Sequence, residues 1–169
     1  MLKKSQIPSS ITLIRLFIAP VIFYTILADE YILSAVLLIF AGFTDFLDGY
    51  LARKLDAASD KGAYLDVIID FIMIIASFVA FVLKSWYDPL IVMLIITMFL
   101  IFIGTSSLKK PVYDPIGKYL GAYLMFMILF SLLFPLNLIR EILLAILIVV
   151  CITSIISRFF RLFILNLRN

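Results

Sequence analysis

The chain has 169 residues, of which 65% are hydrophobic and 15% are charged, and its mean hydropathy is +1.22. A soluble domain has roughly 45–50% apolar and roughly 25% charged residues, so this composition excludes a soluble globule and favours a single membrane domain over residues 1–169. Cys151 is the single cysteine and histidine is absent, which excludes a disulfide framework and the usual zinc ligands. Any catalysis must therefore use carboxylates, basic side chains, hydroxyls or hard metal ions.

Six apolar segments follow one another along the chain, separated by charged or proline-containing joints. Each segment has about the 17–25 residues that a bilayer-spanning helix needs. The sequence therefore predicts an all-α, polytopic membrane protein with six transmembrane helices. We expect these helices near residues 10–28, 31–52, 62–83, 87–108, 115–134 and 138–157.

The basic residues are distributed unevenly about these segments. Twelve of the 14 Lys and Arg residues fall on the side of both termini, whereas Lys84 and Arg140 fall on the other side. Cytoplasmic joints carry an excess of Lys and Arg, so we expect both termini to be cytoplasmic and the protein to be integral to the cell membrane. The twelve are Lys3, Lys4, Arg15, Arg53, Lys54, Lys61, Lys109, Lys110, Lys118, Arg158, Arg161 and Arg168.

Four carboxylates lie where the second and third segments meet. Asp45 and Asp48 are three residues apart and share a helix face, and Asp66 and Asp70 share another with Gly62. A carboxylate within a membrane segment is costly and typical of a functional site. No Lys or His is interleaved on either face, so the converging acids would repel one another unless divalent cations compensate them. All-oxygen ligands indicate Mg²⁺ or Mn²⁺, with Ca²⁺ as an alternative.

Small and basic residues accompany these acids. Gly49, Ala52 and Gly62 remove side-chain bulk, which serves either close helix packing or the approach of a nucleotide or diphosphate to the backbone. Arg53 is placed to contact phosphate oxygens, and it fits equally well as a cytoplasmic anchor.

These residues form the pattern Asp-x2-Asp-Gly-x2-Ala-Arg-x8-Gly-x3-Asp-x3-Asp, which resembles the signature of the CDP-alcohol phosphotransferases. The likeness extends to the start Pro8-Ser-Ser-Ile-Thr12-Leu-Ile-Arg15, although many members have Asn where this chain has Ser9. The resemblance implies transfer of a phosphatidyl-type group from a CDP-linked lipid to an alcohol, with release of CMP, in phospholipid biosynthesis.

The same resemblance implies roles for individual residues. Two Mg²⁺ or Mn²⁺ ions would be held by the four acids of the pattern, and two metal ions about 3.5–4 Å apart can neutralise the attacking and leaving oxygens of such a displacement. Asp70 would also be the base that deprotonates the acceptor hydroxyl. The metal ligands are Asp45, Asp48, Asp66 and Asp70, and the residues that would contact the CDP-lipid are Thr12, Gly49, Ala52, Arg53 and Ser59.

Basic residues on the same side of the membrane indicate how the acceptor is bound. Lys118, Arg158 and Arg161 lie at or within helix ends, where an unpaired charge is costly, so they are candidates to bind an acceptor that carries phosphate. Lys109 and Lys110 join them as candidates and fit equally well as caps that only set the topology. The stretch from Gly117 to Ala122 is similar to a segment of the phosphatidylglycerophosphate synthase branch of the family. This resemblance makes glycerol 3-phosphate the first candidate for the acceptor, inositol phosphate the second and serine the third.

A divalent-cation transporter and a structural scaffold are the alternatives from other classes. A transporter accounts for acids in the membrane but not for the basic residues beside them, and a scaffold accounts for neither. We expect membrane lipids and small molecules as partners, and no nucleic acid. Family members are often homodimers, and this sequence has no clear GxxxG interface, so a homodimer stays open. The lipid tails, diacyl or isoprenoid ether, stay open as well.

Overall fold

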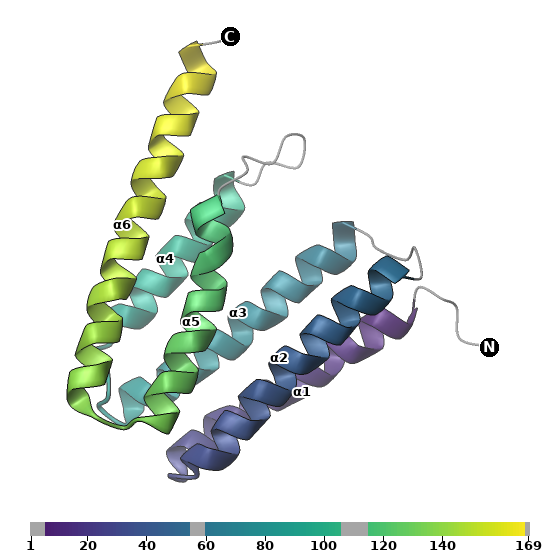
Figure 1. Cartoon of the computed structure of the whole chain (residues 1–169), viewed down its shortest axis with the longest axis vertical. Coiled ribbons are helices and arrows are strands. Elements are labelled where there is room, and N and C mark those ends of the chain that lie inside the picture. The colour runs from purple at the N-terminus through teal and green to yellow at the C-terminus, as the bar shows by residue number, and fades with distance from the viewer. Residues whose placement is uncertain (1–5, 55–59, 106–114, 168–169) are drawn as a thin grey trace. The chain divides into compact units, whose positions relative to one another are not determined.

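The computed structural model describes residues 6–54, 60–105 and 115–167, with side-chain surroundings for 15–47, 54, 65–104 and 119–157. The described residues form helices, without a strand among them, which confirms the all-α prediction for this part of the chain (Figure 1). The helices are α1 (Gln6–Leu27), α2 (Tyr31–Lys54), α3 (Asp60–Leu83), α4 (Leu90–Thr105), α5 (Pro115–Leu133) and α6 (Asn137–Leu167).

Each helix corresponds to one expected segment, and the largest difference is at the end of α6. This helix continues to Leu167, whereas we expected it to end near residue 157. Residues 158–167 contain neither Pro nor Gly, so no helix breaker follows the bilayer-length part of the segment. The helix is therefore longer than the membrane span that we expected, while its membrane-capable part, Asn137–Ser157, covers nearly the same residues as the expected segment.

The chain forms two compact units, Met1–Tyr87 and Asp88–Asn169. In the first unit, α1 packs against both α2 and α3 (Figure 1). Ile22 and Ile26 of α1 and Phe78 and Phe81 of α3 are completely buried in its core. Helix α1 therefore presents side chains to both of its neighbours.

Helices α1 and α3 end in the same way. Asp29 and Ser85 follow them with φ angles of 65° and 57°, in the left-handed region. In each case the amide of the next residue donates to the carbonyl five positions earlier, at 2.9 and 2.8 Å. This is the Schellman closure, in which a left-handed residue lets the chain leave the helix while the last carbonyls stay bonded.

The side chain of Asp29 connects these helix ends. Lys84 donates a hydrogen bond to Asp29 Oδ1 and forms an ion pair with it, and the hydroxyl of Tyr31 donates to the same oxygen. The Tyr31 ring lies 4.9 Å from the ring of Trp86. The hydrogen bond from Lys84 and then that from Tyr31 lower the pKa of Asp29, because both stabilise the charged carboxylate.

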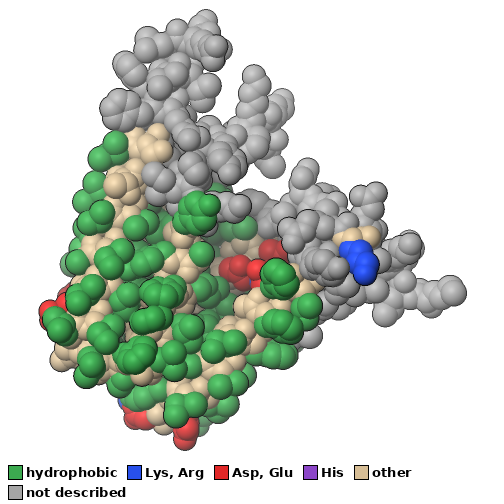
Figure 2. Space-filling model, viewed as in Figure 1, with side chains coloured by type: hydrophobic (Ala, Val, Ile, Leu, Met, Phe, Trp, Pro, Cys, Tyr) green, Lys and Arg blue, Asp and Glu red, His purple; other side chains and the backbone are tan. Residues whose placement is uncertain are grey.

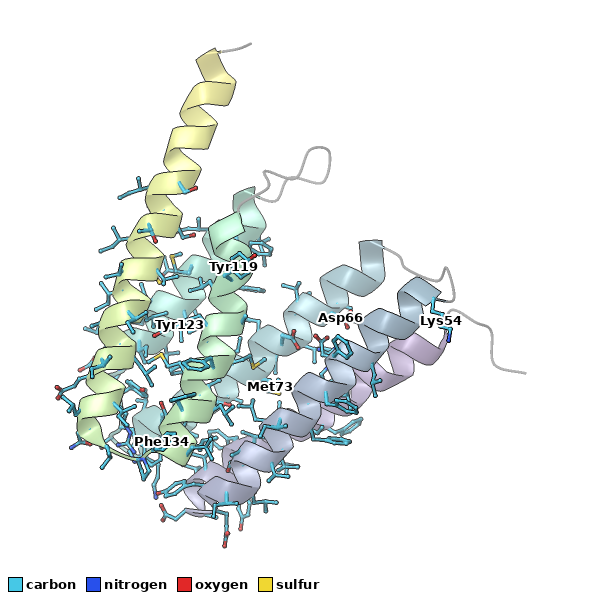
Figure 3. The ribbon with its side chains drawn as sticks, in the orientation of Figure 1. Lys54, Asp66, Met73, Tyr119, Tyr123 and Phe134 are labelled. Carbon is cyan, nitrogen blue, oxygen red and sulfur yellow. The ribbon has the colours of Figure 1, made fainter. Side chains whose placement is uncertain are left out.

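The second unit contains α4, α5 and α6, of which α5 and α6 pack against each other. Met127 of α5 and Leu147 of α6 are completely buried. Tyr123, labelled in Figure 3, donates its hydroxyl hydrogen to the carbonyl oxygen of Leu143 at 2.6 Å, which connects the two helices. The unit therefore combines apolar packing with a hydrogen bond between α5 and α6.

Apolar side chains cover much of the described surface (Figure 2). Phe17, Tyr24 and Ile32 are among them, at 73%, 71% and 79% exposure. Within the described residues, Leu65–Leu83 and Asn137–Ser157 are long and apolar enough to cross a membrane, and four shorter helices are also apolar. Large exposed apolar surfaces mark contact with lipid or with another protein.

Candidate functional site

Arg15 joins the three helices of the first unit. Its side chain is 0% exposed, and one of its terminal nitrogens, NH1, lies 2.7 Å from Asp45 Oδ1 and 2.6 Å from Asp70 Oδ1. The other, NH2, lies 2.8 Å from Asp66 Oδ1. One guanidinium from α1 therefore binds one carboxylate of α2 and two of α3.

The helix periodicity explains why these side chains meet. Ala19 and Ile22, one and two turns after Arg15, are both buried, so Arg15 belongs to the stripe of α1 that faces the core. Asp66 and Asp70 are one turn apart and share the face of α3 that meets this stripe. In Figure 3, Asp66 lies on the stretch of α3 that runs alongside α1 and α2.

Charge in this cluster is only partly balanced. The carboxylates of Asp45, Asp66 and Asp70 are 48%, 35% and 34% exposed, whereas the guanidinium they surround is fully buried. A buried arginine is stable only when it is paired, and here it has three acidic partners. Three carboxylates carry more negative charge than one guanidinium can balance, so the described cluster has a net negative charge. Figure 2 shows acidic side chains gathered on this face.

The structure brings together three of the four predicted metal ligands, Asp45, Asp66 and Asp70. Asp48 lies on α2, but its side chain is outside the described part, so its role stays a prediction. The same is true of the residues predicted to contact the CDP-lipid. Gly49, Ala52 and Arg53 lie in α2, Thr12 lies in α1, and Ser59 falls outside the described residues.

The predicted acceptor residues are not tested by the structure. Lys118 lies in α5, and Arg158 and Arg161 lie in α6, but their side chains are outside the described part of the chain. Lys109 and Lys110 lie outside the described residues altogether. Their role in acceptor binding stays a prediction.

Sequence reasoning missed the role of Arg15. We expected cations from outside the chain to compensate the acids, because no basic residue is interleaved on the two acidic faces. That reasoning overlooked a cation of the chain itself, since α1 supplies Arg15 from 30 to 55 positions earlier in the chain. A signal was present: Arg15 is the only charged residue between Lys4 and Asp29, and a lone charge in an apolar segment needs a partner.

The donor set of this cluster fits a hard divalent cation. Carboxylate oxygens are the ligands that Mg²⁺ and Mn²⁺ prefer, and these three already surround one positive group. Among the described residues, however, no three acidic, His or Cys side chains stand ready as metal ligands. Arg15 engages Oδ1 of each carboxylate, so a metal ion that used these same oxygens would have to displace the guanidinium from them.

Comparison with known proteins identifies the family of the chain. Residues 5–156 match the family described as CDP-alcohol phosphatidyltransferase. A relative from Aquifex aeolicus, named "CDP-diacylglycerol--glycerol-3-phosphate 3-phosphatidyltransferase", is 34% identical over 93 residues, which are 54% of this chain and 52% of the relative. A Pseudomonas fluorescens protein of the same name is 37% identical over 80 residues, 46% of this chain and 41% of the relative.

A further relative has another name. The "Cardiolipin synthase (CMP-forming) / mitochondrial hydrolase fusion protein" of Schizosaccharomyces pombe is 42% identical over 64 residues, 38% of this chain and 11% of the relative. The chain thus spans about half or less of the length of these relatives. The family match covers most of the chain, including all four predicted metal ligands. The chain therefore belongs to the CDP-alcohol phosphatidyltransferase family.

Proposed function

We propose that the chain transfers a phosphatidyl-type group from a CDP-linked lipid to an alcohol, releasing CMP, and that the acceptor is glycerol 3-phosphate. The observation that carries this proposal is the meeting of Asp45, Asp66 and Asp70 within 2.6–2.8 Å of one cationic side chain, inside the region that matches the family. The names of the bacterial relatives support the choice of acceptor.

Asp45, Asp48, Asp66 and Asp70 would hold two Mg²⁺ or Mn²⁺ ions. The oxygen donor set supports this assignment, and so does the i,i+3 spacing that places Asp48 on the helix face of Asp45. Bound ions of this kind supply charge neutralisation on the attacking and leaving oxygens of a phosphoryl-type displacement.

The protein residues would bind the donor and move one proton. The acceptor oxygen forms a bond to the lipid-bearing phosphorus, the bond from this phosphorus to the oxygen of CMP breaks, and Asp70 takes the proton of the acceptor hydroxyl. Arg53 would bind phosphate oxygens, and Gly49 and Ala52 would leave room for the diphosphate. Ser59 and Thr12 complete the proposed donor contacts.

Basic residues would bind the phosphate of the acceptor. Lys118, Arg158 and Arg161 fall on the same predicted side of the membrane as the acids, as do Lys109 and Lys110. Charge-assisted hydrogen bonds from such residues favour a phosphorylated acceptor over serine. Inositol phosphate shares this chemistry and is the second choice.

The six helices would cross the membrane, with both termini and the carboxylate cluster on the cytoplasmic side. The exposed apolar surface and the two long apolar helices support an integral membrane protein. The distribution of Lys and Arg supports the orientation.

Formation of cardiolipin is a second candidate, because one relative is named a CMP-forming cardiolipin synthase. Such a reaction also releases CMP but uses a lipid that carries a free hydroxyl, namely phosphatidylglycerol. The donor half of the site would serve both reactions, so only the acceptor distinguishes them.

The decisive experiment measures CMP release by purified protein supplied with CDP-diacylglycerol and either Mg²⁺ or Mn²⁺. Glycerol 3-phosphate, inositol phosphate, serine and phosphatidylglycerol are offered in separate reactions. We expect CMP release with glycerol 3-phosphate, and we expect it to stop when the metal is chelated. Release should continue in the control variant Asp29→Asn, because Asp29 lies at the turn between α1 and α2. Metal-dependent release with phosphatidylglycerol alone would favour the second candidate. No release with any acceptor, together with Mn²⁺ flux into vesicles, would favour a transporter.

A further inference from the structure

Arg15 contacts the carboxylate oxygens that a metal ion bound at this cluster would also use as ligands. Its NH1 and NH2 atoms lie 2.6–2.8 Å from Oδ1 of three carboxylates that come from two helices. It is the only charged residue of α1, and its side chain is 0% exposed. A cation that belongs to the chain therefore occupies the centre of the acidic cluster.

The bonding of this guanidinium is incomplete. Its Nε atom is buried and has no hydrogen-bond partner within the described part of the chain. Burying a donor without a partner costs free energy. This cost at Nε offsets part of the stabilisation that the hydrogen bonds to the three carboxylates provide. Within the described residues, the guanidinium is therefore not part of a fully satisfied hydrogen-bond network.

A divalent cation and Arg15 compete wherever both use the same Oδ1 atoms of these carboxylates. Mg²⁺ and Mn²⁺ require close oxygen ligands in a regular geometry, and each Oδ1 is already within hydrogen-bond distance of the guanidinium. The positive charge of Arg15 also repels a second cation at short range, most strongly in an environment of low dielectric.

We propose that Arg15 is an exchangeable internal cation, which competes with the divalent ion for Asp45, Asp66 and Asp70. This inference rests on the metal site of the proposed function. Arg15 holds the three helices together while no metal is bound, and it releases the carboxylates when the metal enters. The affinity for metal is thus set by a residue of α1 that is not itself a ligand.

The test measures Mn²⁺ binding to purified protein without CDP-lipid, by electron paramagnetic resonance of the free ion. The variants are Arg15→Gln, Arg15→Lys and the control Lys84→Gln, which removes an exposed ion pair of the same unit. Removal of the competing charge should tighten Mn²⁺ binding by at least about tenfold in Arg15→Gln. Arg15→Lys should be intermediate, because one ammonium group cannot reach three carboxylates with two separate nitrogens. Lys84→Gln should match the wild type.

A second measurement follows thermal unfolding in chelator and in Mn²⁺. Arg15→Gln should unfold at a lower temperature than the wild type in chelator, because its carboxylates then lack a cation. Mn²⁺ should raise the unfolding midpoint of this variant more than it raises that of the wild type.

Unchanged or weaker Mn²⁺ binding in Arg15→Gln would overturn the exchange while leaving the metal site standing. Where Arg15→Gln is not recovered folded, Arg15→Lys decides, and Mn²⁺ binding no tighter than wild type overturns the exchange. Absence of Mn²⁺ binding in every variant would overturn the proposed metal site and the exchange with it.

Discussion

Arg15 and Asp70 are 55 residues apart in the sequence, and their side chains meet across 2.6 Å. The contact passes from α1 to α3 and places a carboxylate proposed as the catalytic base beside a permanent positive charge. The same guanidinium nitrogen also binds Asp45 of α2. The geometry of the acidic cluster therefore depends on α1, although the acids themselves come from α2 and α3.

Asp70→Asn tests the proposed base. The amide cannot accept the proton of the acceptor hydroxyl, so transfer should fall by about 10²- to 10⁴-fold. Binding of CDP-lipid should fall much less than transfer, because three of the four proposed metal ligands are intact while the base is lost. CMP release and calorimetric donor binding give the two readouts, with Asp29→Asn as the control for loss of one carboxylate. Substantial turnover in Asp70→Asn would remove this residue from the role.

Asp45→Asn tests the metal ligands. This variant removes one carboxylate of α2 and leaves Asp70 unchanged, so Mn²⁺ binding and CDP-lipid binding should weaken together if the diphosphate binds to the ions. The measurement is a calorimetric titration of donor at several Mn²⁺ concentrations. Normal donor binding at low Mn²⁺ would show that Asp45 is not a ligand.

Arg158→Gln and Arg161→Gln test the acceptor site. If these residues bind the acceptor phosphate, each substitution should raise the acceptor KM by about 10- to 150-fold, the equivalent of a charge-assisted bond, and spare the donor KM. The effect should shrink at higher salt if the proposed site opens to water, because salt screens charges that are exposed to solvent. Acceptor KM values are measured at two salt concentrations in protein with verified insertion. A KM equal to that of the wild type would favour serine or another neutral alcohol.

The ion pair between Asp29 and Lys84 predicts a small pH dependence of stability. Hydrogen bonds lower the pKa of Asp29 below its ordinary value of 3.8, so the contribution is present above pH 3.8 and is lost as the pH falls through the lowered folded-state pKa. Asp29→Asn lacks this contribution. The difference in unfolding midpoint between the wild type and Asp29→Asn should therefore shrink as the pH falls below 3.8. A difference that stays constant down to pH 2 would contradict this assignment.

Phe78→Ala tests the core of the first unit. Phe78 is 0% exposed, and its ring lies 5.8 Å from that of Phe81 and 5.9 Å from that of Tyr87. Loss of this ring should lower the free energy of unfolding by about 3–5 kcal/mol. Phe40→Ala is the matched control, since Phe40 is 50% exposed and its loss leaves no cavity. Equal effects of the two substitutions in denaturant unfolding would contradict the placement of Phe78.

The sequence predicted the helices well because each is a long apolar segment that ends at charged or proline-containing joints. It also predicted that Asp45 would approach Asp66 and Asp70, since spacings of three and four residues place side chains on one helix face. It did not predict the partner of Arg15, because periodicity identifies the face of a helix but not the helix that packs against it. The length of α6 was missed for another reason. The thickness of a bilayer limits an apolar span, but not a helix that continues beyond it.

The chain order of the Arg15 contacts has a consequence for biosynthesis. Helix α1 leaves the ribosome first, and Asp70 follows 55 residues later, a delay on the order of several seconds at roughly 5–20 residues per second. During that interval, an α1 placed in the membrane carries a guanidinium without its α3 partners, and such a side chain extends toward the nearest water. Asp45 of α2 is made earlier and supplies one partner, and α3 supplies the other two, Asp66 and Asp70. If the first three helices cross the membrane as proposed, their insertion would be coupled, because the full set of carboxylate partners of Arg15 is present only after α3 has been made.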